Sequence, residues 1–391
     1  MTRSSPAVLD VAIAGAGPTG LALALALRRA LGRSLRIALF DPALARPAGQ
    51  DARASMIAAD GRRLLQDVGA WPDNAAPVAG LRITDSRLDD AIRPTFLELG
   101  DRALDGEPFA HMVADSELRA ALRRRAEEEG VELVAAAIDR HEATPGGLTL
   151  SFGLDERRCR LLVAADGARS PTRAREGIAA HQFAYDQIAL VATLGHEAPH
   201  GGVAVQHFLP GGPFAMLPLS GNRCSLVWSE RRAEAERVIA ADDSAFLAEV
   251  ERRAGPDFGA LTLDGPRGAF PLRFLLARSF VGRRVALAGD AAHVVHPLAG
   301  QGFNVALRDV AALSRIVAAA ARGGEDFGAA ATLALYERAR RLEVASVAAA
   351  TDGLYRLFAH GATRGLRDVG MGLIDRAPSL KRRIVATAAG L

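Results

Sequence analysis

The chain has 391 residues, of which 49% are hydrophobic and 24% charged, the composition of a folded protein with two or three domains. A formal net charge of only +3 argues against nucleic acid as a partner. Cys159 and Cys224 lie far apart and form no CxxC pair, which disfavours a disulfide framework and a zinc site, so we expect no metal. A reducing, cytoplasmic compartment is the simplest expectation.

The apolar segment 8–27 has to be weighed as a signal peptide. It contains three motif glycines and a proline, lacks a small-residue cleavage site and is followed at once by a strand pattern. No other segment reaches the roughly 18 to 20 uninterrupted apolar residues that a membrane span needs. We therefore expect no membrane-spanning segment.

Three elements open the predicted fold. The apolar run 8–14 stops at a glycine and predicts a buried strand, while 21–31 is rich in Ala and Leu and predicts a helix. The segment 35–40 predicts a second strand. Together they predict the first βαβ unit of a parallel sheet.

Further elements of the same kind follow. A helix is predicted over 116–129 with Ser116 as its N-cap, and a strand at 131–136 comes after it. Short buried strands are predicted at 161–165 and 285–288, each ending at a Gly/Asp pair.

Between about residues 180 and 275 the pattern changes to short alternating segments separated by Gly/Pro turns, such as 187–194, 203–209 and 224–228. This pattern predicts an antiparallel sheet inserted into the parallel one. From Phe303 on, the chain is predicted to be helical almost to its end.

The sequence thus predicts an α/β fold with a Rossmann-like nucleotide-binding domain (parallel sheet), an inserted, mostly antiparallel β-sheet domain and C-terminal helices. The predicted ranges are 1–72, 105–178 and 278–345 for the discontinuous Rossmann-like domain, 73–104 and 179–277 for the inserted domain, and 346–391 for a C-terminal helical segment.

A glycine-rich loop of the GxGxxG pattern follows the first predicted strand. Gly15 permits a tight turn, Gly17 lets the backbone approach a pyrophosphate, and Gly20 lets the helix pack closely on the strand. Asp41 lies 21 positions after Gly20, about the spacing expected for a carboxylate that binds a ribose. The loop residues assigned to cofactor binding are Gly15, Ala16, Gly17, Pro18, Thr19 and Gly20. At this point NAD and FAD both fit.

A second loop follows the predicted strand 285–288. Gly289 and Asp290 are followed by Pro297 and by a helix that begins near Gly302. An aspartate there can accept a hydrogen bond from a ribityl hydroxyl, and the helix amides can face the pyrimidine edge of a flavin. A nicotinamide dehydrogenase has no use for this loop, so the sequence favours FAD.

A third turn, Asp166-Gly167, follows the predicted strand 161–165. An Asp-Gly turn after a strand is common by itself. In this order with the other two loops, it indicates a turn that packs on the pyrophosphate region.

These motifs resemble the class A FAD-dependent aromatic hydroxylases, and within them the ubiquinone-biosynthesis hydroxylases of the UbiH/UbiF/VisC type. The resemblance covers nearly the whole chain. The segments that carry it are 15–20 (GAGPTG), 51–55 (DARAS), 165–170 (ADGARS), 210–219 (PGGPFAMLPL), 225–228 (SLVW), 289–313 (GDAAHVVHPLAGQGFNVALRDVAAL) and 351–358 (TDGLYRLF). The segment 289–313 is the most specific of them.

The resemblance implies roles for individual residues. Asp41 would hold the adenosine ribose, Arg53 would contact the cofactor near the pyrophosphate and ribityl chain, and Asp290 would hold the ribityl chain. Gly302, Phe303 and Asn304 would border the isoalloxazine. The expected set is completed by Asp115, Asp166, Gly289 and Pro297.

Two positions depart from the family pattern. Asp115 stands where relatives often carry an Asn or Gln that faces FAD, and Phe303 replaces a more usual leucine. The first departure changes the side chain that would meet the cofactor, and the second changes packing but keeps the backbone donors.

In this family NAD(P)H reduces the flavin, O2 adds at its C4a position and the hydroperoxide delivers one oxygen to an activated ring. The resemblance therefore implies FAD, NAD(P)H as a transient reductant and O2 as a co-substrate. Because only one dinucleotide fingerprint is present, NAD(P)H would dock transiently in a surface groove, or a partner protein would supply electrons. His293 and His296 lie on the second loop, where hydrogen bonding to backbone and proton transfer are both open, so no catalytic residue is assigned.

The expected partners also come from the resemblance. The apolar segment 210–219 suits a lipophilic aromatic substrate and equally a plain buried strand, and a polyprenylated quinone precursor is implied by the family alone. The tail 355–391 mixes apolar residues with basic ones, which are Arg364, Arg367, Arg376, Lys381, Arg382 and Arg383. It fits peripheral contact with the inner face of a membrane, a solvated helical face on the FAD domain, or a partner-binding surface within a multienzyme quinone-biosynthesis complex.

Two rival functions remain open. One is another FAD-dependent reaction on the same scaffold, such as reduction or epoxidation of an isoprenoid. The other is a flavin-loaded, non-catalytic subunit of a quinone-biosynthesis complex. A nicotinamide dehydrogenase is the weakest alternative.

Overall fold

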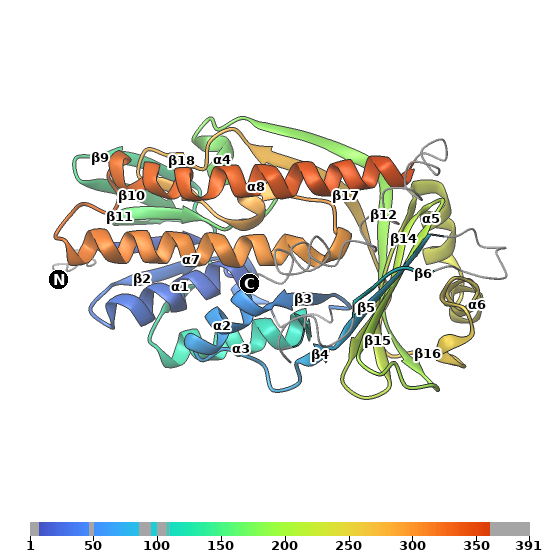
Figure 1. The fold of residues 1–391 in the computed structure, drawn as a ribbon. Coiled ribbons are helices and arrows are strands. Elements are labelled where there is room, and N and C mark those ends of the chain that lie inside the picture. The colour runs from blue at the N-terminus through green and yellow to red at the C-terminus, as the bar shows by residue number, and fades with distance from the viewer. Residues whose placement is uncertain (1–7, 47–50, 86–94, 100–107, 109, 360–391) are drawn as a thin grey trace.

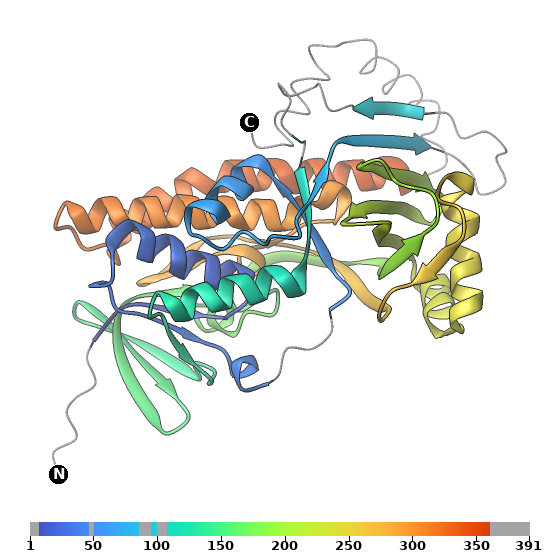
Figure 2. The same ribbon diagram turned by 90° about the horizontal axis from the view of Figure 1, so that it is seen from below.

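The computed structural model describes residues 8–46, 51–85, 95–99, 108 and 110–359. A parallel sheet with its helices forms one end of the molecule, and a larger, mostly antiparallel sheet forms the other (Figure 1). The long helices α7 and α8 lie side by side, and α8 reaches from the parallel sheet to the antiparallel one (Figures 1 and 2).

The parallel sheet has the strand order β18-β19-β11-β1-β2-β8, and β10 and β9 extend β11 as a hairpin. The strands are β1 (Leu9–Ala14), β2 (Ile37–Phe40), β8 (Glu132–Val134), β9 (Arg140–Thr144), β10 (Gly147–Phe152), β11 (Asp155–Ala164), β18 (Val281–Gly282) and β19 (Val285–Leu287). Neighbours from β19 to β8 pair in parallel, so their C-terminal ends meet at one edge. Their runs of Val, Ile, Leu and Ala are buried because helices and loops cover both faces.

Six helices accompany this sheet. They are α1 (Pro18–Leu31), α2 (Ala59–Asp67), α3 (Asp115–Glu128), α4 (Pro171–Arg175), α7 (Gln301–Arg322) and α8 (Ala330–Ala359). Helix α1 begins at Pro18, whose fixed φ suits a first helical turn, and ends before Gly32. Its Leu and Ala side chains pack on β1 and on α7, so this part of the chain has one continuous core.

The antiparallel sheet has the order β20-β17-β12-β15-β14-β13-β5-β6, with β16 paired to β12. The strands are β5 (Gly80–Asp85), β6 (Thr95–Leu99), β12 (Ala180–His196), β13 (Val203–Leu209), β14 (Gly212–Leu219), β15 (Arg223–Arg231), β16 (Leu261–Leu263), β17 (Gly268–Ala277) and β20 (His293–Val294). The pair β13–β5 is parallel, and the other pairs are antiparallel. A third, three-stranded sheet consists of β3 (Ala54–Ala58), β7 (Ala110–Ala114) and β4 (Ala76–Val78).

Two helices that the sequence did not predict, α5 (Arg232–Ala240) and α6 (Asp243–Ala254), cover one face of the antiparallel sheet. Phe214 and Trp228 of the sheet pack there against Phe246 of α6, all fully buried. The opposite face therefore looks toward the parallel-sheet part of the molecule.

The predicted α/β architecture is confirmed, with local corrections. Ser116 is not a cap, because helix α3 already begins at Asp115 and Ala114 occupies its N-cap position. The expected junction between 345 and 346 falls inside the continuous helix α8. The basic residues of the tail, Arg364 to Arg383, and parts of the expected segments 1–72, 73–104 and 105–178 lie outside the described residues.

Candidate active site

Four of the predicted segments meet along one edge of the parallel sheet. Asp290 follows β19, Asp166 follows β11, the Gly15 loop follows β1 and Asp41 follows β2. These four strands are direct neighbours in that order. Neighbouring strands lie about 4.8 Å apart, so the edge from Asp290 to Asp41 is about 14 Å long. This length is enough for the middle of an extended dinucleotide.

The glycine loop combines tight packing with open space. A Cβ on Gly15 would lie 2.2 Å from the Ala165 carbonyl oxygen, and a Cβ on Gly20 would lie 2.0 Å from the Gly15 carbonyl oxygen. A Cβ on Gly17 would meet nothing within 4 Å. Gly17 is also the N-cap of α1 and has no side chain to cap it, so the helix N-terminus faces the open space.

Asp41 holds this loop from the neighbouring strand. Its Oδ2 accepts a hydrogen bond from the Ala16 amide at 2.9 Å, and its Oδ1 accepts one from the Ala43 amide at 2.8 Å. Each carboxylate oxygen keeps a second lone pair for a hydroxyl group.

The two carboxylate oxygens of Asp166 differ in their hydrogen bonding. Its Oδ2 accepts a hydrogen bond from the Thr172 amide at 3.1 Å. Its Oδ1 is buried and has no partner among the residues that the structure describes. A buried acceptor of this kind calls for a donor that the chain itself does not supply.

The second loop lies against the first. Gly289 has the left-handed φ of 59°, and a Cβ there would lie 3.0 Å from Thr19 Oγ1. The next residue, Asp290, is accessible to solvent, yet burial raises the pKa of its carboxyl group above the ordinary value.

The start of α7 has the same open character as the start of α1. Gly300, in the left-handed region at φ 63°, is its N-cap and offers no capping side chain. A Cβ on Gly302 would meet nothing within 4 Å. Pro297 precedes this turn at the start of a short 3-10 helix, and the Phe303 side chain packs on the main core.

The side chain of Asn304 is fully used inside the protein. Its Oδ1 accepts from the Ala58 amide at 2.8 Å, and its Nδ2 donates to the Met56 carbonyl at 2.8 Å and the Gly300 carbonyl at 3.2 Å. Asn304 therefore ties α7 to β3, and only its backbone can face a cofactor.

Arg53 lies between acidic groups beside Asp290. It forms a 2.6 Å ion pair with Asp51, and its Nε lies 3.8 Å from the Asp115 carboxylate. Burial raises the pKa of Asp115, opposed by a 2.7 Å hydrogen bond from Ser55 Oγ and by Arg53. The Asp115 side chain is thus held by Ser55 and Arg53 rather than pointing free.

The free face of the antiparallel sheet lies next to this cluster. The Arg53 guanidinium carbon stands 5.2 Å from the ring centre of Phe270 on β17. Phe270 pairs with Ala189, and the next row on the same face consists of the small apolar residues Gly268, Val191, Val227 and Ala215 by the strand registers. This face offers an apolar wall within reach of the second loop.

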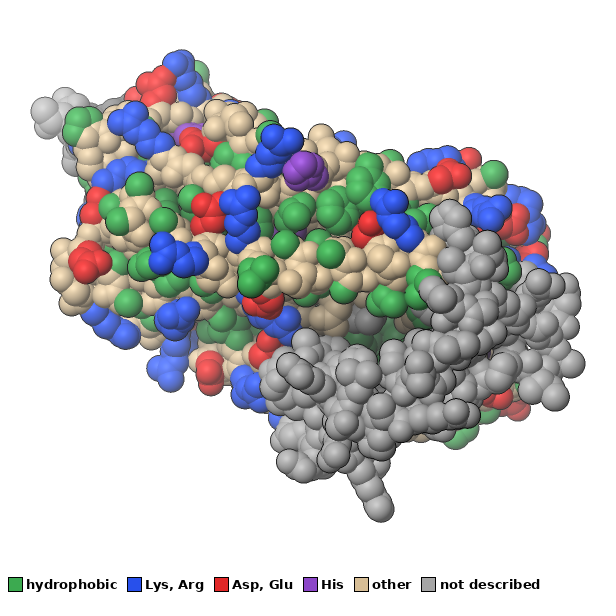
Figure 3. Space-filling view, turned by 45° about the horizontal axis from the view of Figure 1, so that its top comes forward, with side chains coloured by type: hydrophobic (Ala, Val, Ile, Leu, Met, Phe, Trp, Pro, Cys, Tyr) green, Lys and Arg blue, Asp and Glu red, His purple; other side chains and the backbone are tan. Residues whose placement is uncertain are grey.

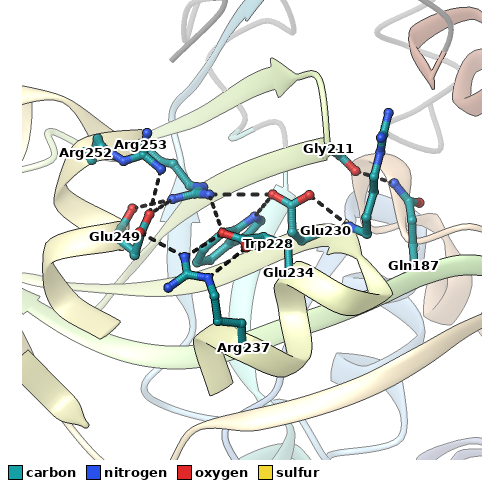
Figure 4. A network of polar contacts seen from close by, with 10 residues as sticks. Gln187, Gly211, Trp228, Glu230, Glu234, Arg237, Glu249, Arg252 and Arg253 are labelled. Carbon is teal, nitrogen blue, oxygen red and sulfur yellow. Dashed lines mark hydrogen bonds and ion pairs between the residues drawn. The ribbon is translucent and has the colours of Figure 1, made fainter. Parts of the chain in front are cut away.

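A buried charge network supports the turn at the end of this wall (Figure 4). The Arg253 guanidinium lies 4.0 Å from the centre of the Trp228 ring and 3.7 Å from Glu230. A Cβ on Gly211 would lie 1.7 Å from Glu230 Oε1, so glycine alone fits beside this carboxylate. The Gln187 amide donates to the Gly211 carbonyl at 2.7 Å, which links the turn to β12.

The two loop histidines have different surroundings. His293 donates from Nε2 to the buried carboxylate of Asp309 at 2.6 Å, so its bond goes to a side chain rather than to backbone. His296 is fully buried, donates from Nε2 to Gln187 Oε1 at 3.1 Å and stacks on Tyr355 at 5.0 Å. Burial lowers the pKa of His296 to about 4, so its imidazole is neutral at pH 7.

Asp309, Arg340 and Gln187 are not among the site residues that the sequence predicted. No spacing in the chain links these residues to the second loop, because each reaches it across tertiary contacts.

Together the uncapped helix starts, the space at Gly17, the unpartnered Asp166 oxygen and the exposed Asp290 carboxylate fit a dinucleotide that has polar groups at both ends. The fold and this edge define the class of FAD-dependent oxidoreductases, with an apolar sheet face beside the site.

The chain belongs to the FAD-binding domain family, whose model matches residues 8–351. It is 40% identical to the ubiquinone hydroxylase UbiL of Rhodospirillum rubrum, with 100% of this chain and 91% of that protein covered. It is 31% identical to the 3-demethoxyubiquinol 3-hydroxylase of Escherichia coli, with 98% of both covered. It is also 31% identical to the ubiquinone biosynthesis monooxygenase COQ6 of Rattus norvegicus, with 99% of this chain and 92% of that protein covered.

Solved structures share the fold. The p-nitrophenol 4-monooxygenase PnpA of Pseudomonas putida superposes with a TM-score of 0.79 at 18% identity, over 97% of both chains. PqsL of P. aeruginosa, solved with 2-aminobenzoylacetate, superposes with a TM-score of 0.78 at 21% identity, over 93% of this chain and 99% of that chain.

Proposed function

We propose that this protein is an FAD-dependent monooxygenase that hydroxylates the aromatic ring of a polyprenylated ubiquinone precursor, with NAD(P)H as reductant and O2 as co-substrate. The observation that carries the proposal is the contact of Arg53 with Phe270, which sets the apolar wall directly beside the cofactor edge. The named functions of the relatives that match nearly the whole chain support the substrate class.

We assign the cofactor contacts along the edge of the sheet. The adenosine end would meet Asp41, the pyrophosphate would meet the α1 N-terminus beside Gly17, and the ribityl chain would meet Asp290. The full set proposed to line the FAD site is Gly15, Ala16, Gly17, Pro18, Thr19, Gly20, Asp41, Arg53, Asp115, Asp166, Gly289, Asp290, Pro297, Gly302, Phe303 and Asn304.

Bound FAD supplies the redox chemistry, being reduced by NAD(P)H and activating O2. The chain's own part is binding and orientation. The uncapped amides at Gly302 and Phe303 present a positive helix end to the flavin's electron-rich edge, and Arg53 balances the carboxylates around it. The wall at Val191, with Phe270 beside it, excludes water from the aromatic ring of the substrate.

We also propose that the protein works at the inner, cytoplasmic face of a membrane, as a lipid substrate requires. No helix in the described part of the chain is long and apolar enough to span a bilayer. Figure 3 shows hydrophobic and basic side chains next to one another on one face. Phe183 is 40% exposed, and its ring centre lies 6.0 Å from the guanidinium carbon of Arg356. Leu354 is 43% exposed and lies on α8, the helix that also carries Arg356. Membership of a multienzyme quinone-biosynthesis complex is proposed from the relatives' pathway alone.

Deleting the gene tests the proposed reaction. We expect loss of the quinone and accumulation of a prenylated intermediate that lacks one ring hydroxyl, and full recovery with the wild-type gene. An accumulated intermediate with all its ring hydroxyls but an altered isoprenoid double bond would contradict hydroxylation and favour a reductase or epoxidase. Recovery by a variant that binds FAD but has no turnover would favour a non-catalytic subunit.

Binding to lipid vesicles tests the membrane proposal. The full-length protein should sediment with vesicles that contain anionic lipid and less with neutral ones, because basic side chains favour an anionic surface. Equal recovery in the supernatant with both kinds of vesicle would contradict it.

A further inference from the structure

A fully buried carboxylate, Asp309 of α7, lies behind the second loop. Its Oδ2 accepts hydrogen bonds from the Gly289 amide at 3.0 Å and from His293 Nε2 at 2.6 Å. Its Oδ1 accepts one from Arg340 Nε of α8 at 2.7 Å. The side chain has 0% exposure, so these three donors take the place of water.

Helix α8 supports the second loop at two points. The Tyr336 hydroxyl donates to the Leu287 carbonyl at 2.8 Å, at the end of β19. Four residues further along the helix, Arg340 holds Asp309, and it also donates to the Val305 carbonyl at 3.3 Å. The strand end before the loop and the carboxylate behind it are therefore both fixed by α8.

The Asp309 carboxyl group stays ionised although it is buried. Burial alone would raise the pKa of this carboxyl group, but the nearby His293 and Arg340 outweigh it and hold the pKa below the ordinary value. Asp309 is consequently ionised at neutral pH, and its hydrogen bonds are charge-assisted.

The turn that Asp309 holds decides where Asp290 points. Gly289 has a left-handed φ of 59°, and rotation of its amide would redirect the next side chain. His293 secures the other end of the same turn. We propose that Asp309, held by Arg340, is a positioning residue that fixes the turn at Gly289 and thereby sets the affinity of the protein for FAD. The inference rests on the proposed function only in taking FAD as the ligand of this loop.

The test is titration of full-length apoprotein with FAD, followed by flavin fluorescence and by the visible absorption of the bound flavin. Loss of charge-assisted hydrogen bonds predicts that Asp309→Asn raises the dissociation constant of FAD about 10- to 100-fold. The bound flavin should also show a shifted visible spectrum, because its surroundings change.

Glu176→Gln is the matched control. Glu176 also accepts from a histidine, His141 Nε2 at 2.7 Å, and from a backbone amide, that of Arg283 at 2.9 Å. Those partners lie on β9 and in the β18–β19 turn rather than on the second loop. The control should lose stability as Asp309→Asn does but keep the dissociation constant for FAD within about twofold.

Equal FAD affinities and spectra for wild type, Asp309→Asn and Glu176→Gln would overturn the proposal. If Asp309→Asn does not fold, Arg340→Lys and Arg340→Gln replace it. Arg340→Lys keeps the positive charge beside Asp309, so this variant should bind FAD more tightly than Arg340→Gln. Wild-type FAD affinity in both variants would overturn the proposal. Because no turnover is measured, a wild type that binds FAD but hydroxylates nothing contradicts the proposed function without touching this result.

Discussion

Replacing Gly17 by alanine tests where the cofactor lies. A Cβ at Gly17 meets no atom within 4 Å, and φ there is −74°, so alanine fits the folded backbone. The helix start loses a favourable N-cap residue, which costs at most about 1 kcal/mol. We therefore expect apoprotein with a thermal midpoint within about 4 °C of the wild type.

The same methyl group would occupy the space assigned to the pyrophosphate. If the phosphate oxygens lose two charge-assisted hydrogen bonds to the α1 N-terminus, about 3 kcal/mol or more of binding free energy disappears. FAD affinity should fall at least about 100-fold, measured by titration of apoprotein.

Two glycines serve as controls for this experiment. Gly20→Ala would drive its Cβ to 2.0 Å from the Gly15 carbonyl oxygen and should cost about 3 kcal/mol or more of stability. Gly353→Ala, at an open position in α8, should stabilise the helix by up to about 1 kcal/mol and leave FAD binding unchanged. Folded Gly17→Ala protein that binds FAD within about threefold of wild type would refute the assigned cofactor position.

Three further predictions follow from single contacts. Gly211→Ala should lower the free energy of unfolding in urea by about 1–3 kcal/mol, because its Cβ would displace Glu230 from its buried network; an unchanged midpoint would contradict this. The pKa of His296 is about 4 in the folded protein and about 6.5 in the unfolded chain. The contribution of its neutral imidazole to the free energy of unfolding is therefore complete above pH 6.5 and falls as the pH drops toward 4. Between pH 7.5 and pH 5, the free energy of unfolding of the wild type should fall by about 2 kcal/mol more than that of His296→Gln. Parallel profiles of unfolding free energy against pH would count against a neutral imidazole. The pKa of Asp115 is raised, so as the pH increases above about 4 the wild-type carboxyl group becomes negatively charged beside an anionic cofactor. The FAD affinity of Asp115→Asn should therefore change less with pH than that of the wild type. Identical pH profiles in FAD titrations would remove Asp115 from the site.

The edge of the parallel sheet could be predicted because its signals are local. Gly15 and Asp41 directly follow β1 and β2, and Asp166 and Asp290 follow shortly after the apolar ends of β11 and β19. Parallel neighbours bring the ends of their strands together at one edge. The order of the strands, which puts β11 between β1 and β19, needed the structure, since strand pairing is a long-range choice.

Other parts of the site could not be predicted, because no pattern in the neighbouring sequence marks them. Asp309 occupies a helical position like any other on α7, and only the packing of α8 shows that Arg340 reaches it. Helices α5 and α6 were missed because the alternating strands around them dominate the pattern of that region. Gln187 meets His296 across the junction of the two sheets, a contact no spacing in the sequence records.

The central claim is tested most directly by turnover under isotope-labelled O2. Purified, FAD-loaded protein is given NAD(P)H and a polyprenylated phenol that lacks one ring hydroxyl. We expect substrate-dependent oxidation of NAD(P)H, with one labelled oxygen in the new ring hydroxyl of each product molecule. Labelled oxygen found only in peroxide, with the ring unchanged, would contradict it.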